Sequence, residues 1–177
     1  MTESSDAIDL TLDELRAVTG WAVECAQPAL VIFERIRSDD ARVRSALDVA
    51  RAFAEGARRT KGLRDAAWDA HRAAQAARDA NQRAAHDAAR AAGHAAGAAF
   101  LHPLARPTQV RHILGAAALT ARAIELDADQ AGCADYLERV VSSAPLTVVD
   151  VLRRYPAAPA GGRRVSELIQ LLDEALR

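Results

Sequence analysis

Five histidines are the side chains with the most scope for chemistry in this sequence, because imidazole can bind metals and exchange protons near neutral pH. They stand at positions 71, 86, 94, 102 and 112. No two of them are three or four residues apart, the spacing that places two ligands on one helix face, and no His-Glu-x-x-His motif occurs. We therefore expect no metal ion and no other cofactor.

The sequence also lacks a recognisable nucleophile. It contains no Gly-x-Ser-x-Gly turn and no glycine-rich phosphate loop. Cys25 falls on the apolar face of a predicted helix, where a core position is expected. With only two cysteines the chain is not a disulfide scaffold, and we expect a reduced, cytoplasmic protein without catalytic residues.

A binding surface is instead predicted around residues 93–115, where three histidines meet arginine and glutamine at a helix–helix corner. The alternative is structural, with His102 capping a carbonyl and His112 hydrogen-bonded inside the bundle. The predicted surface also draws on a tryptophan and a histidine from an earlier helix. Its members are Trp68, His71, His94, His102, Arg106, Gln109, Arg111 and His112.

The formal net charge is only -1, which indicates neither nucleic acid nor an acidic membrane surface as partner. Positive charge is nevertheless concentrated in two segments of the sequence. No acid lies between Asp87 and Glu125, so the arginines there could form a basic stripe, unless acids of the first helix cover it. The run 161–164, Gly-Gly-Arg-Arg at a helix start, could hold an anion. Its alternative is a flexible linker with solvated arginines.

The elements that position these residues are predicted to be helices. Alanine supplies 43 residues and the aromatic types only seven, which favours helix over strand. A capping box at 11–14 begins the first helix, which Pro28 should kink or divide. Residues 60–101 are expected to form a hairpin with its break at 79–82, one long helix being the alternative. A helix beginning at Pro107 should close the bundle.

Beyond residue 127 alanine thins out, and shorter helices are expected at about 130–143, 146–155 and 163–176. The fold class is therefore all-α: a helical bundle of about five helices over 10–126, and an extension of two or three shorter helices over 127–177. The last helix carries an apolar stripe that must dock on the bundle or on a second subunit. No signal peptide or membrane span is expected, since the longest uncharged apolar stretch, 91–105, contains two histidines and a proline.

Four stretches carry a resemblance to a known family: LRAVTGWAVECA at 15–26, DVARAFAEG at 48–56, AAWDAH at 66–71, and AAGHAAGAA at 91–99 followed by LGAAA at 114–118. Over roughly residues 10–126 the chain resembles the alanine-rich, all-helical immunity proteins of bacterial polymorphic toxin systems, of the fifth immunity class or a close relative. This resemblance implies a protein that neutralises a cytoplasmic toxin by binding, without catalysis. The alternatives are a small-molecule-binding or enzymatic helical domain that uses the corner from His94 to His112, and a structural homodimer.

Overall fold

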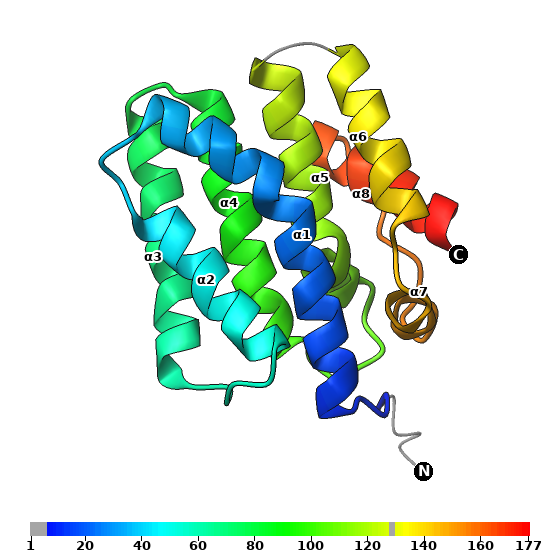
Figure 1. Cartoon of the computed structure of the whole chain (residues 1–177). Coiled ribbons are helices and arrows are strands. Elements are labelled where there is room, and N and C mark those ends of the chain that lie inside the picture. Colours follow the sequence, from blue (N-terminus) through cyan, green and yellow to red (C-terminus); the bar gives the residue numbers. More distant parts are fainter. Residues whose placement is uncertain (1–6, 128–129) are drawn as a thin grey trace.

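Eight α-helices and two short 3-10 turns make up most of residues 7–127 and 130–177, the residues that the computed structural model describes (Figure 1). The described residues contain no β-strand, and their one isolated bridge joins Ala7 to Leu104. The predicted all-α class is therefore confirmed. Within this part of the chain, no helix is both long and apolar enough to cross a membrane.

Five helices form the bundle: α1 (Leu12–Ile36), α2 (Arg42–Ala54), α3 (Lys61–Asp79), α4 (Arg83–Gly97) and α5 (Val110–Asp127). The predicted capping box begins α1, because the Thr11 hydroxyl accepts from the Glu14 amide and the Glu14 carboxylate accepts from the Thr11 amide. Pro28 lies inside α1 and does not divide it. The helix bends along its length (Figure 1), as expected where proline removes a backbone hydrogen bond.

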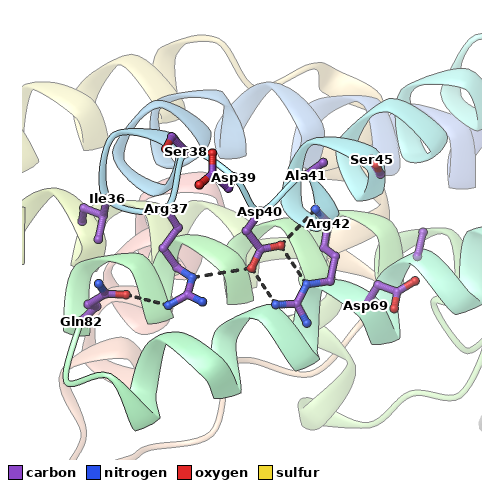
Figure 2. A pocket seen from close by; sticks show the side chains of 11 residues that line it. Ile36, Arg37, Ser38, Asp39, Asp40, Ala41, Arg42, Ser45, Asp69 and Gln82 are labelled. Carbon is purple, nitrogen blue, oxygen red and sulfur yellow. Dashed lines mark hydrogen bonds and ion pairs between the residues drawn. The ribbon is translucent and has the colours of Figure 1, made fainter.

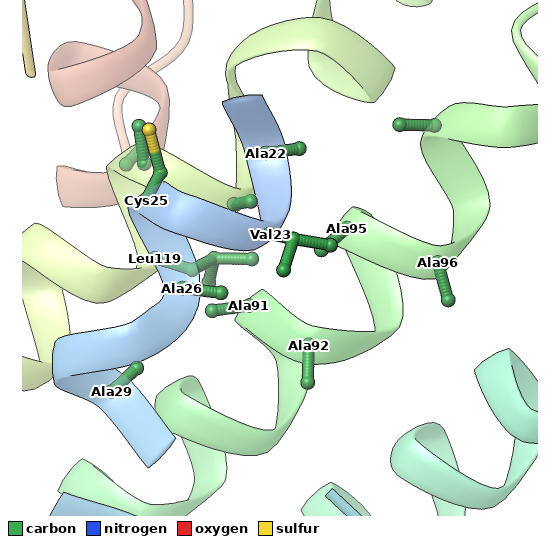
Figure 3. Close-up of a cluster of buried hydrophobic side chains, with 14 of the residues drawn as sticks. Ala22, Val23, Cys25, Ala26, Ala29, Ala91, Ala92, Ala95, Ala96 and Leu119 are labelled. Atoms are coloured by element: carbon green, nitrogen blue, oxygen red, sulfur yellow. The ribbon is translucent and has the colours of Figure 1, made fainter. Parts of the chain in front are cut away.

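Helix α4 is the central element of the bundle and packs against α1, α2, α3 and α5 (Figure 1). All of its alanines are buried and share one wide face of the helix, whereas residues 86, 90, 93, 94 and 97 on the opposite face are only partly buried. Because alanine is small, neighbouring helices can approach closely. Figure 3 shows this seam, where Ala26 of α1 faces Ala91 of α4 beside Leu119 of α5.

The alanine-rich stretch folds as a hairpin of α3 and α4, so the predicted break at 79–82 is confirmed and the single long helix is wrong. Asn81 adopts a left-handed backbone conformation with φ of 58°. Asparagine tolerates that conformation better than most residues, because its short side chain can bond to the nearby backbone. The turn therefore falls where asparagine permits a reversal.

An irregular segment connects α4 to α5 and contains the turns η1 (Ala98–Phe100) and η2 (Pro107–Gln109). The Gln109 Oε1 atom accepts a hydrogen bond of 3.0 Å from the His102 amide, and the Tyr155 hydroxyl donates to the His102 carbonyl at 2.8 Å. These contacts fix the segment through its backbone. The His102 side chain is exposed.

Three further helices follow: α6 (Gln130–Ser142), α7 (Leu146–Arg153) and α8 (Arg164–Leu176). Helix α8 packs against α5 and α6, and Leu168, Leu172 and Leu176 are buried there. The predicted apolar stripe is thus covered within its own chain. The buried Asp173 accepts hydrogen bonds from the Ala158 amide and from Arg177, which tie the preceding loop and the chain end to α8. The division into two domains at residue 127 stays a prediction.

Candidate functional site

A cavity of about 500 Å³ opens where α3, α4 and the start of α5 meet. We call it the aromatic cavity. It is lined by Arg64, Ala67, Trp68 and His71 of α3, by Arg90, Gly93, His94 and Gly97 of α4, and by Phe100 and His112.

Helical spacing brings these residues to one place. In α3 and in α4 alike, the four lining residues follow the spacing i, i+3, i+4, i+7, which is one continuous face of a helix. Two of the α4 positions are Gly93 and Gly97, which carry no side chain. A Cβ added at Gly97 would have His112 Nδ1 as its nearest neighbour, at 3.9 Å. The absence of side chains here leaves the space that the larger residues surround.

His94 and His112 lie side by side, with ring centroids 6.4 Å apart. His94 rests on Gly115 of α5, where an added Cβ would lie only 2.6 Å from its Nδ1 atom. Burial, helped by the positive charges of Arg90 and Arg111, lowers the pKa of His94 from its ordinary 6.5 to about 4. Its imidazole is therefore neutral near pH 7.

His112 carries a buried polar atom without a partner. Its Nδ1 atom is buried and has no hydrogen-bond partner among the described residues. Burial is also the main cause that lowers the His112 pKa, with Arg111 as the second cause. A buried polar atom without a partner costs free energy that a suitable ligand atom could recover.

Exposed aromatic rings form the outer rim of the cavity. Trp68 is 57% exposed, although large aromatic residues are usually well buried, and its ring meets His71 edge-on with centroids 5.8 Å apart. The Arg64 guanidinium lies 5.0 Å from the centre of the Phe100 ring, within reach of a cation–π interaction. The rim thus offers apolar area next to positive charge.

The chemistry of the cavity suits binding of an apolar group that carries negative charge. None of the lining residues is acidic, whereas two are arginines and three are histidines. No cysteine lines it. Cys25 is buried in the bundle, as predicted, and burial raises its pKa to about 12. Among residues 7–127 and 130–177, no three His, Cys, Asp or Glu side chains are grouped so that they could hold a metal ion.

The structure distributes the eight predicted surface residues over separate places. Trp68, His71, His94 and His112 line the aromatic cavity together. The other four, His102, Arg106, Gln109 and Arg111, do not line it. The structural alternative is wrong on both counts, because His102 bonds through its backbone and His112 Nδ1 has no partner in the described structure.

Sequence reasoning missed the three larger side chains Arg64, Arg90 and Phe100 of this cavity, as well as the methyl group of Ala67. Two of them could have been found. Arg64 precedes Trp68 by four residues, and Arg90 precedes His94 by four, so each lies on the same helix face as a predicted residue. Phe100 lies in the turn after α4, where no periodic pattern applies.

A larger cavity, of about 730 Å³, lies at the loop between α1 and α2 (Figure 2). Most of its charged groups are paired: Arg42 bonds Asp40 through two nitrogens at 2.8 and 2.6 Å, and Arg37 bonds Gln82 at 2.9 Å and lies 3.6 Å from Asp40. The buried Arg37 Nε atom has no hydrogen-bond partner among the described residues. The Arg42 hydrogen bonds lower the pKa of Asp40. This network joins the loop to the start of α4, so a structural role accounts for it.

Acids of the first helix do not cover the basic stretch between Asp87 and Glu125, and that expectation is wrong. In α1, Glu14 pairs with Arg154 at 2.5 Å and Glu34 with Arg44 at 2.6 Å. The stretch contains four arginines, at positions 90, 106, 111 and 122. Two of them form ion pairs with acids close by in the sequence, Arg90 with Asp87 and Arg122 with Glu125.

Comparison with known proteins gives one match, to a family model described as Imm-5 like putative immunity protein, over residues 9–146. No curated protein and no solved structure matches the chain. The matched range includes every residue that lines the aromatic cavity, whereas nearly all of α7 and α8 lies beyond it. The resemblance seen in the sequence is confirmed, and the chain belongs to the Imm-5 like putative immunity protein family.

Proposed function

We propose that this protein neutralises a cytoplasmic protein toxin by binding it, without catalytic turnover, and that the aromatic cavity is part of the surface it uses. Membership of an immunity protein family supports the general role. The single observation that carries the choice of surface is Trp68, a 57% exposed tryptophan at the rim of a cavity that contains the unpartnered His112 Nδ1 atom.

Exposed tryptophan next to arginine is typical of a binding hot spot. Tryptophan, tyrosine and arginine dominate the residues whose loss costs the most binding energy, because they combine large apolar area with polar groups. Trp68 and Arg64 share the cavity rim, and both belong to α3. A side chain of the toxin that enters the cavity would cover the tryptophan and reach the free His112 Nδ1 atom.

The residues of the cavity also favour binding over turnover. His94 is neutral, and none of the described lining residues is a carboxylate that could orient it or a cysteine or serine that it could activate. A catalytic pair needs such a neighbour within hydrogen-bond reach.

Protection of cells tests the proposal. The chain would be expressed together with candidate toxin domains chosen from the neighbourhood of its gene, and growth compared for the wild type, Trp68→Ala and Val31→Ala. Val31 is 68% exposed on α1, so its substitution controls for loss of an exposed apolar side chain elsewhere. We expect protection by the wild type and Val31→Ala and reduced protection by Trp68→Ala. Equal protection by all three would remove the cavity from the proposal.

A small-molecule binding role is the second candidate, and the size of the cavity favours it. Its volume of about 500 Å³ falls within the range of about 300–1,000 Å³ found for ligand sites. In that case the isolated protein would bind a small apolar anion in the cavity, and Trp68→Ala would lower that affinity without any toxin present.

A further inference from the structure

A second cavity, of about 250 Å³, lies where α8 docks on the bundle. Five arginines line it: Arg90 of α4, Arg111 and Arg122 of α5, and Arg163 and Arg164 at the start of α8. We call it the arginine cleft. It shares Arg90 and His94 with the aromatic cavity, so the two cavities are neighbours.

The charges around the arginine cleft do not balance. Arg90 has Asp87 at 3.6 Å, Arg122 has Glu125 at 2.9 Å, and Arg164 has Glu125 at 2.6 Å and Glu167 at 3.1 Å. Among residues 7–127 and 130–177, neither Arg111 nor Arg163 takes part in an ion pair, and no acidic side chain lines the cleft. Two positive charges are therefore left without a partner.

The start of α8 adds further positive potential. Its N-cap residue, Arg163, makes no side-chain capping bond, and the first backbone bond of the helix runs from the Glu167 amide to the Arg163 carbonyl. The amides of the first turn are thus left for another acceptor, and the helix dipole makes this end positive. Glu167 in the first turn offsets part of this positive potential but bonds to Arg164, and Arg163 has no acidic partner.

The loop before α8 approaches its first turn closely. A Cβ added at Gly161 would lie 2.7 Å from the Ser166 Cβ, so this approach requires glycine. Ser166 itself lines the arginine cleft. Gly161 therefore lets the loop fold back against the start of α8, and Arg163 lies beside the cleft.

We propose that the arginine cleft binds a compact, doubly charged oxyanion of the phosphate class. Two negative charges would match the unpaired Arg111 and Arg163. Oxygen atoms in a tetrahedral arrangement could accept from both guanidinium groups and from the first amides of α8, as phosphates do at helix N-termini. Arg163 and Arg164 lie beyond the matched residues 9–146, so the site combines the family region with the extension.

Titration calorimetry of the purified chain with inorganic phosphate tests this proposal. A parallel titration with chloride would use the same ionic strength, so that general screening of charges is the same in both experiments. We expect saturable binding of phosphate by the wild type. The double variant Arg111→Gln, Arg163→Gln should weaken it by at least about tenfold, because it removes the charge-assisted hydrogen bonds of both unpaired guanidinium groups.

The matched control is the double variant Arg58→Gln, Arg139→Gln, which removes the same charge from two exposed positions outside the cleft. It should bind phosphate as the wild type does, and circular dichroism would verify that both variants are folded. No saturable phosphate binding by the wild type, or equal loss in both double variants, would overturn the proposal. Since no toxin is present, this result is independent of the proposed immunity function.

Discussion

Replacing His94 should change how the stability of the protein depends on pH. His94 has a pKa of about 4 in the folded protein and an ordinary value of 6.5. In the unfolded chain it therefore gains a proton as the pH falls through 6.5, while in the folded protein it stays neutral. The folded state therefore keeps its full stability, as far as His94 is concerned, above pH 6.5. Its free energy of unfolding decreases as the pH falls from 6.5 toward 4.

The size of this effect follows from the two pKa values. Between pH 7 and pH 5 the unfolded state should gain about 2 kcal/mol relative to the folded state from His94 alone, as an order of magnitude. His112 acts in the same direction, because its pKa is lowered as well. In His94→Gln the first contribution disappears, so this variant should lose about 2 kcal/mol less than the wild type over the same pH range.

Urea unfolding followed by circular dichroism at pH 7 and pH 5 measures both losses. All other titrating groups are common to the two proteins, so the difference between the losses isolates His94. His102→Gln, which removes an exposed imidazole from the α4–α5 connection, should behave as the wild type does. If His94→Gln and the wild type lost the same free energy between pH 7 and pH 5, the assignment of His94 as a half-buried, neutral histidine would be refuted.

Three other predictions concern packing and fold. Gly115→Ala should lower the free energy of unfolding by about 1–3 kcal/mol, since its Cβ would lie 2.6 Å from His94 Nδ1. Gly93→Ala, whose Cβ meets nothing closer than 3.5 Å, should raise it by up to about 1 kcal/mol through helix propensity, and urea midpoints would compare the two. Leu172→Ala, at a 1% exposed position, should cost about 2–5 kcal/mol, whereas Leu171→Ala, at a 51% exposed position, should cost less than about 1 kcal/mol. Far-UV circular dichroism should show a helical spectrum, and a substantial sheet signal would contradict the architecture.

Local signals allowed the helices to be predicted well. The capping box at Thr11 is a contact between neighbouring residues, so its sequence pattern is enough to locate the start of α1. The turn at Asn81 likewise depends on the preferences of a few adjacent residues. Pro28 is the exception, because packing around α1 keeps the helix continuous where local chemistry alone would allow a division.

The candidate site was only half predictable, since it depends on how helices meet. His94 and His112 are 18 residues apart and come together only because α4 and α5 pack side by side. The prediction grouped them with His102 and Arg106 by proximity in sequence, but the connection between the helices holds those two outside the cavity. The docking of α8 was expected, yet its contribution to the arginine cleft depends on the side of α5 that it covers, which periodicity does not determine.

The affinity of the purified chain for its toxin domain tests the central claim most directly. Calorimetry would compare the wild type with Trp68→Ala and with the control Val31→Ala, using the toxin domain against which the wild type protects cells. If the aromatic cavity is the binding surface, Trp68→Ala should lose about 2 kcal/mol or more, which is at least about thirtyfold in affinity, and the control should bind as the wild type does. Equal affinity of all three proteins for the toxin, or no binding by the wild type, would contradict this account.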